Sequence, residues 1–234
     1  MKAIFKRELQ AYFKTPVAYI FIGMFLAISA IYFTTYTLIG GSPSIDSILY
    51  SLLFVFMFLI PVLTMRLLSE EKNKKTDLVL FTAPVSVWDI ILGKFFAACT
   101  VYLTTLLLTL IYLIVIGTHG EPAYPQILCQ YIGFFLLGVS FISIGLFVSS
   151  LTENQIVSAI VTFIIILILY SMESLSAGIT APVLKEIASA LSITSRFNPF
   201  NLGVLALEPF VYYLTIIALF LFLTRQVEEG RRWR

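Results

Sequence analysis

RLLSEEKNKKTDLVLFTAPVSVWDIILGKFF, residues 66–96, places a dense group of charges between two long apolar runs. The 234-residue chain around it is 59% hydrophobic and only 12% charged, with a mean hydropathy of +0.98. Soluble domains are about 45–50% apolar and about 25% charged. The composition therefore predicts an integral membrane protein, in which the quoted stretch connects two membrane spans.

The apolar runs predict how often the chain crosses the bilayer. A helix needs about 20 apolar residues to cross a hydrocarbon core about 30 Å thick. The first run is too long for the apolar core of a signal peptide, and no small-residue cleavage site follows it, so we expect the chain to keep it. We predict an all-α, single-domain protein over residues 1–234 with six transmembrane helices, at residues 17–39, 48–68, 90–117, 127–150, 155–175 and 209–224.

The distribution of Lys and Arg predicts the orientation, because these residues favour the cytoplasmic side. With six spans both termini lie on one side, and residues 69–89, called the elbow below, lie there too. That side holds thirteen of the fifteen basic residues, leaving Lys185 and Arg196 on the other. We therefore expect a multi-pass protein of the cell's inner (plasma) membrane with both termini in the cytoplasm.

Residues 1–14 have the pattern of an amphipathic helix. One face carries Ile4, Phe5, Leu9, Tyr12 and Phe13, and the other carries Lys2, Lys6, Arg7, Gln10 and Lys14. Such a helix lies in the membrane interface with its cations near anionic headgroups. The alternative is a plain start to the first span with positive flanks, and we favour the interfacial helix.

The elbow has its own local signals. Thr76 can cap a short helix, and Asp77 in its first turn is favoured by the helix dipole. An apolar tetrad follows, and Pro84 ends the helix. The charged run before it is typical of a solvated loop, but the exposed tetrad favours a docking surface for lipid or protein. The tetrad consists of Leu78, Val79, Leu80 and Phe81.

A second helix is predicted to begin at the end of the elbow. Ser86 is its cap, and Asp89 three residues later completes a pair similar to a capping box. Trp88 lies where an aromatic belt is expected, and Lys94 can extend its ammonium from the membrane edge. Small residues in the fourth span also predict a face for close helix packing. They are Gly133, Gly138, Ser140, Ser143 and Gly145.

Several segments resemble ABC-2 type transporter permeases. These are RLLSEEK at 66–72, TDLVLFTAPVS at 76–86 and ILGKF at 91–95. GLFVSSLTENQ at 145–155 is similar to the family's turn between the fourth and fifth spans. FNPFNLGVL at 197–205 and RRWR at 231–234 are similar to the subgroup linked to gliding motility and copper-enzyme maturation.

The resemblance implies half of a transporter that pairs with a second copy of itself or a related chain. A short cytoplasmic coupling helix, here residues 76–82, would receive force from a separate ATP-binding subunit. The implied coupling surface is Glu70, Glu71, Lys72, Thr76, Asp77, Leu78, Leu80, Phe81 and Glu153. Residues 1–14 correspond to the family's interfacial helix, and residues 176–208 to an outer-face interfacial or re-entrant segment. The subgroup also suggests an accessory subunit on the outer face.

Other chemistry finds little support in the sequence. No Gly-x-x-x-x-Gly-Lys-Ser/Thr phosphate loop is present, so ATP and Mg belong on a partner chain and this chain needs no cofactor. A net charge of +2 gives no reason to expect nucleic acid. Cys99 and Cys129 lie in apolar segments as packed thiols, which predicts neither a disulfide nor a metal site. His119 is either a ligand or, as we favour, a loop histidine.

Glu173 is the one acid well inside a predicted span. A group of this kind is a functional candidate by default. We favour the alternative, a side chain that reaches the interface or a hydrogen bond to a neighbouring helix. An intramembrane enzyme is therefore disfavoured, and we predict a permease subunit that exports or moves an amphipathic or extended substrate. The rival hypothesis is a non-transporting scaffold or sensor that recruits a cytoplasmic partner through the elbow.

Overall fold

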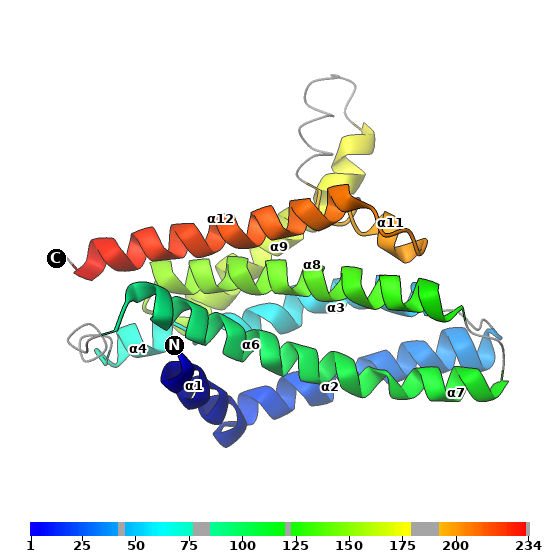
Figure 1. The fold of residues 1–234 in the computed structure, drawn as a ribbon, viewed down its shortest axis with the longest axis horizontal. Coiled ribbons are helices and arrows are strands. Elements are labelled where there is room, and N and C mark those ends of the chain that lie inside the picture. The colour runs from blue at the N-terminus through cyan, green and yellow to red at the C-terminus, as the bar shows by residue number, and fades with distance from the viewer. Residues whose placement is uncertain (42–44, 77–84, 120–122, 179–191, 233–234) are drawn as a thin grey trace.

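A computed structural model describes residues 1–41, 45–76, 85–119, 123–178 and 192–232, and every regular element in these ranges is a helix (Figure 1). The elements are α1 (Lys2–Lys14), α2 (Pro16–Phe33), the π-helix η1 (Thr34–Ile39), α3 (Asp46–Thr64), α4 (Ser69–Asn73), α6 (Val87–Thr109), α7 (Ile111–His119), α8 (Tyr124–Leu151), α9 (Gln155–Gly178), α11 (Asn198–Asn201) and α12 (Leu207–Arg232).

Six helical segments within the described ranges are long and apolar enough to cross a membrane. They are Pro16–Ile39, Asp46–Asn73, Val87–Thr118, Tyr124–Leu151, Gln155–Met172 and Leu207–Arg231. The predicted fold class, an all-helical protein with six such helices, is confirmed. The last helix continues well past the apolar run at 209–224, because its polar final turns also pack against the protein.

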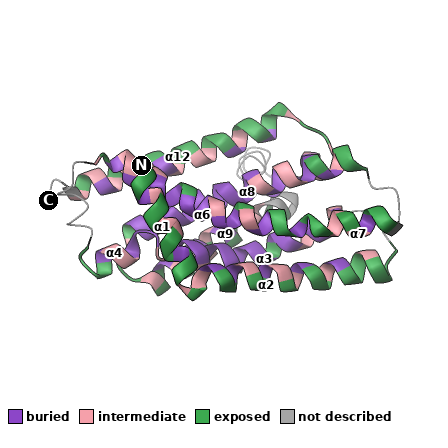
Figure 2. Cartoon of the chain, turned by 60° about the horizontal axis from the view of Figure 1, so that its bottom comes forward, coloured by how far each residue is buried: buried purple, intermediate pink, exposed green. Residues whose placement is uncertain are grey.

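Helix α8 is the centre of the bundle. It packs against α3, α6, α9 and α12, and most of its side chains are buried (Figure 2). Helices α2, α9 and α12 bury far less and leave many apolar side chains exposed. Because lipid is the solvent for a membrane helix, these exposed apolar faces are compatible with a bilayer or with a second copy.

Glycines let other elements approach α8 closely. A Cβ atom at Gly133, Gly138 or Gly145 would overlap Phe200, Tyr102 or Thr64, respectively. The predicted close-packing face of the fourth span is therefore confirmed, and its neighbours come from α3, α6 and α11. Small residues play this part in membrane bundles because packing, rather than the hydrophobic effect, holds the helices together.

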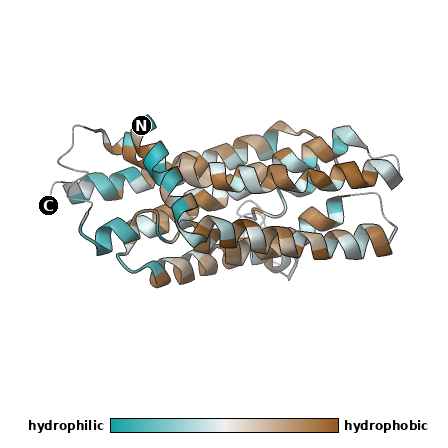
Figure 3. Ribbon diagram, turned by 90° about the horizontal axis from the view of Figure 1, so that it is seen from below, coloured by the Kyte–Doolittle hydropathy of each residue, from teal (hydrophilic) through white to brown (hydrophobic). Residues whose placement is uncertain are grey.

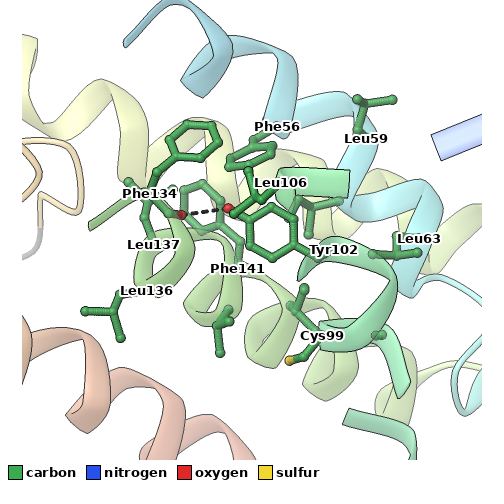
Figure 4. Packing of buried hydrophobic residues seen from close by; sticks show 14 of the residues in the cluster. Phe56, Leu59, Leu63, Cys99, Tyr102, Leu106, Phe134, Leu136, Leu137 and Phe141 are labelled. Atoms are coloured by element: carbon green, nitrogen blue, oxygen red, sulfur yellow. Dashed lines mark hydrogen bonds between the residues drawn. The ribbon is translucent and has the colours of Figure 1, made fainter. Parts of the chain in front are cut away.

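The gap at Gly138 is filled by an aromatic cluster (Figure 4). The fully buried Tyr102 hydroxyl of α6 donates a hydrogen bond of 2.7 Å to the Phe134 carbonyl of α8. The ring of Phe56, from α3, lies with its centroid 4.6 Å from that of Phe134 and 5.4 Å from that of Tyr102. These contacts join three spans at mid-height, and the hydrogen bond satisfies a hydroxyl that would be costly to bury alone.

Hydrophilic residues gather at one end of the bundle, which we call the charged end (Figure 3). Both chain termini, α1 and α4 lie there (Figure 1). Helix α1 packs against α6 and α2, and its Tyr12 hydroxyl donates a 2.8 Å hydrogen bond to the Leu63 carbonyl of α3. Burial raises the pKa of Tyr12, so its hydroxyl remains a donor. Helix α1 is therefore fixed to the bundle along its apolar face.

The described part of residues 176–208 lies near the far end of the bundle. Phe200 of α11 packs against Gly133, and the Gln130 side chain of α8 donates a 2.9 Å hydrogen bond to the Asn201 carbonyl. The Tyr213 hydroxyl of α12 donates to the Ile193 carbonyl at 2.9 Å. Residues 192–206 are thus attached to α8 and α12, whereas residues 179–191 lie outside the described ranges.

Replacing Gly138 by Ala should destabilise the bundle by about 1–3 kcal/mol, because the new methyl group overlaps the buried Tyr102 ring. Gly23→Ala in α2 is the matched control, since a Cβ there meets nothing within 4 Å and Ala favours helix. Thermal unfolding of both purified variants in detergent measures the difference. Equal midpoints for Gly138→Ala and wild type would contradict the packing argument.

Candidate functional site

The elbow begins where α3 gives way to the short helix α4. The backbone N–H groups of Leu68 and Ser69 both donate to Ser149 Oγ of α8, each at 3.0 Å. The Ser149 hydroxyl in turn donates to the Met65 carbonyl at 3.2 Å. Amides at a helix start have no intrahelical acceptor. Ser149 supplies one and thereby fastens the start of the elbow to the end of α8.

Four charged side chains from three elements meet behind the elbow: Arg7 and Glu8 of α1, Glu71 of α4 and Lys94 of α6. We call them the elbow cluster. Lys94 Nζ lies 3.0 Å from Glu71 and 3.2 Å from Glu8, and its side chain is only 1% exposed. Arg7 Nη2 lies 2.6 Å from a carboxylate oxygen of each acid. The cluster therefore contains two cations and two anions in direct contact, and its net charge is zero.

The two carboxylates of the cluster favour the charged form of Arg7. Burial tends to lower the pKa of Arg7, but hydrogen bonds and charges from Glu8 and Glu71 outweigh it and raise the pKa. A buried ammonium such as Lys94 is tolerated only when counter-charges and hydrogen bonds surround it. The cluster therefore holds α1, the elbow and the start of α6 together as one charge-balanced unit.

The position of Lys94 corrects the sequence-based expectation that its ammonium extends from the membrane edge. Its neighbour Gly93 explains the difference, because the Ile4 side chain of α1 occupies the space that a Cβ atom at residue 93 would take. That close approach brings Glu8 beside Lys94. Glu8 was not expected from the sequence to be a site residue. The sequence signal that could have identified Glu8 is that it is an acid within a basic segment next to a span. Such an acid needs a cation nearby.

A second buried ion pair lies deeper in the elbow. Lys72 Nζ is 2.7 Å from Glu228 Oε1 of α12, and the side chains are 1% and 5% exposed. Lys72 also donates to the Ser150 carbonyl at the end of α8. The sequence places Lys72 on a docking surface, but the continuation of α12 past its apolar run covers it. A direct contact of Lys72 with a partner would require this pair to open.

The rim of the elbow is more accessible. Glu70 binds Arg66 and Lys74, each at 2.7 Å, and Arg66 also donates to Thr15 Oγ1. Glu153, between α8 and α9, is 68% exposed, with Arg231 3.9 Å away. Among the other predicted coupling residues, Thr76 is exposed. Asp77, Leu78, Leu80 and Phe81 lie outside the described residues, as does most of segment 76–82.

The helix after the elbow starts as predicted. Ser86 Oγ accepts from the Asp89 backbone N–H at 3.1 Å and lies 2.8 Å from Asp89 Oδ2, so the predicted cap of α6 is confirmed. Trp88 is half-buried, and the Arg225 guanidinium lies 5.4 Å from its ring centroid, within cation–π range. The remaining predicted interface cations, Lys2, Lys6 and Lys14, are exposed on α1.

Other sequence candidates contribute little to this site. Cys99 and Cys129 are free and buried, in agreement with their interpretation as packed thiols. The side chains of His119 and Glu173 lie outside the described residues. Within the described ranges no group of three potential metal ligands comes together.

The fold and the site together define a multi-pass membrane protein whose elbow is attached to several helices at the charged end. Residues 27–224 match the family described as ABC-2 family transporter protein. Because this match covers most of the sequence, the chain belongs to the ABC-2 transporter family and is a membrane permease component of such a transporter. The family is not itself catalytic and works with an ATP-binding subunit. No curated protein matches the chain.

Removing the charge of Lys94 should destabilise the protein by about 3–5 kcal/mol, because Glu8 and Glu71 would then share Arg7 alone. Lys94→Met tests this, and Lys6→Met at an exposed position of α1 is the control, expected to stay within about 0.5 kcal/mol. Thermal unfolding in detergent gives the stability. Maleimide labelling of Ile4→Cys, a buried position, reports whether α1 has detached.

Proposed function

We propose that this permease moves an amphipathic or extended substrate across the cell's inner (plasma) membrane, driven by a separate ATP-binding subunit that docks at the elbow. The observation that carries the proposal is the attachment of the elbow to four other helices, α1, α6, α8 and α12. A docking surface that must transmit force needs such a rigid base, whereas a plain solvated loop does not. ATP and Mg would be bound by the partner, for which family membership gives the reason.

Some residues of the elbow would contact the partner, and others would attach the elbow to the bundle. Segment 76–82, with its apolar residues, would contact the ATP-binding subunit, flanked by the rim residues Glu70 and Glu153. Charges at the rim of an interface mainly give orientation and specificity. Glu71 and Lys72 belong to the same surface in sequence, but their buried ion pairs suit them to hold the elbow in place.

The mechanism follows from these attachments. ATP binding would draw two motor subunits together beneath a pair of permeases. The elbow would pass that movement to α3, which leads directly into it, and to α6 and α1, which the elbow cluster binds. A packed helical unit moves as a body rather than deforming. A groove between the two copies would then open or close.

The orientation that we propose puts the charged end in the cytoplasm. Thirteen of fifteen basic residues fall on that side under the six-span topology. The exposed apolar faces of α2, α9 and α12 leave room for a second permease copy, identical or related. The segments 197–205 and 231–234 support membership of the gliding-motility and copper-enzyme-maturation subgroup, and with it an accessory subunit on the outer face. The largely uncharged spans favour an amphipathic cargo over a small ion.

The docking prediction can be tested by purifying the tagged permease gently from its native membrane and identifying its partners by mass spectrometry. We expect a phosphate-loop ATPase in near-equal amount. Leu78→Asp with Leu80→Asp should lower its recovery at least about tenfold, since a charge in an apolar contact costs several kcal/mol. Leu205→Asp is the matched control, because Leu205 is exposed near the far end.

Two outcomes would contradict parts of this proposal. A folded, dimeric permease that brings down no ATPase would favour a scaffold that recruits another partner. Full recovery of the ATPase with the doubly substituted permease would place docking outside segment 76–82.

The orientation has its own test in sealed right-side-out membrane vesicles. A membrane-impermeant maleimide should label Leu202→Cys and should leave Lys74→Cys unlabelled until the vesicles are opened. Both positions are exposed, whereas the native Cys99 and Cys129 are buried and give little background. Labelling of Lys74→Cys in closed vesicles would invert the proposed topology.

A further inference from the structure

The last span is attached to the elbow by an ion pair, but the mechanism above passes movement only to α1, α3 and α6. Lys72 and Glu228 form a 2.7 Å ion pair with both side chains almost fully buried. One residue lies on α4 and the other in the final turns of α12. The pair therefore spans two elements that are distant in the sequence, and it lies at the base of the elbow.

A buried ion pair is weak evidence for stability by itself. Removing two charges from water costs about as much as their attraction returns, and apolar residues of similar size often do as well. What such a pair does achieve is a defined arrangement, because a displaced partner would leave a bare buried charge. The geometry therefore points to a role in holding α12 in one position relative to the elbow.

Further contacts of the same region support a rigid attachment. Lys72 also donates to the Ser150 carbonyl, and the preceding turn is held by Ser149, so the pair is anchored to the end of α8. Helix α12 packs along α8 over much of its length. Its Arg225 lies over the Trp88 ring at the start of α6. The end of α12 is thus bound to α4, α6 and α8 together.

We propose that the Lys72–Glu228 pair is a strut that makes α12 move with the elbow. Resting on the proposed function, this adds the last span to the elements that the motor subunit drives. The strut stays closed throughout the transport cycle. The elbow, the end of α8 and the end of α12 form one body, and displacement of the elbow carries the last span and the segment 192–206 attached to it.

The test measures the distance between the elbow and α12 by double electron–electron resonance. Spin labels at Lys74→Cys and Gln226→Cys, both exposed positions, report it in a chain whose two native cysteines are replaced by Ala. In the permease alone we expect one narrow distance distribution. In Lys72→Met with Glu228→Met, which replaces the pair by apolar side chains, we expect a distribution at least about twice as broad.

The double substitution separates the strut from ordinary stability. Because it leaves no unpaired buried charge, its thermal midpoint should remain near that of the wild type, whereas Lys72→Met alone should unfold earlier. Glu229→Gln is the matched control, since the Glu229–Arg225 pair lies within α12 and is about one-third exposed. This control should leave the distance distribution narrow.

The same labels then report on the working complex. With the co-purified ATPase, and with ATP and vanadate added, the wild-type distance should not change, while that of the double variant should shift. An unchanged narrow distribution in the double variant without nucleotide would overturn the strut, and so would a wild-type pair that separates on adding ATP and vanadate. Absence of an ATPase would contradict the proposed function but would leave the measurement on the permease alone decisive.

Discussion

A charge removed from water needs a counter-charge within reach, and this requirement organises the charged end of the molecule. The side chains of Lys94 and Lys72 are each 1% exposed, and each ammonium lies within about 3 Å of a carboxylate, as a buried charge requires. Those carboxylates come from α1, α4 and α12. Satisfying two buried ammonium groups therefore fixes the positions of the first helix, the elbow and the last helix relative to α6 and α8.

The apolar body of the bundle works by a different rule. Between spans, where lipid competes with protein for every apolar contact, close approach replaces hydrophobic driving force. Glycines of α8 provide that approach for Tyr102 and Thr64, and Gly93 of α6 provides it for α1. Gly93 links the two rules, because the space it leaves beside Ile4 also brings Glu8 to Lys94.

These two rules explain what could be predicted from the sequence. The number of spans follows from apolar length, the cap at Ser86 from a local pattern, and the close-packing face of α8 from small residues at helical spacing. All three are properties of short segments. The partners of Lys94 and Lys72 are not, because Glu8 and Glu228 are brought to them by chain folding over long separations. Neither acid was singled out from the sequence. The length of α12 was predicted too short for the same reason. Its polar final turns look like a solvated tail in the sequence, and only the folded chain brings Glu228 to Lys72.

The long-range pairs also change how the elbow should be regarded. A charge run between two spans suggests a docking surface for a partner. Two of its charged side chains, Glu71 and Lys72, instead form ion pairs with other helices of the same chain. In the proposed docking, contact with the partner then falls to segment 76–82, Glu70 and Glu153, while Glu71 and Lys72 hold the elbow against other helices. A partner that pushes on a soft loop moves only the loop. Because the base here binds α1, α6, α8 and α12, a push on the elbow would reach most of the bundle, and the arrangement suits a permease whose energy comes from another chain.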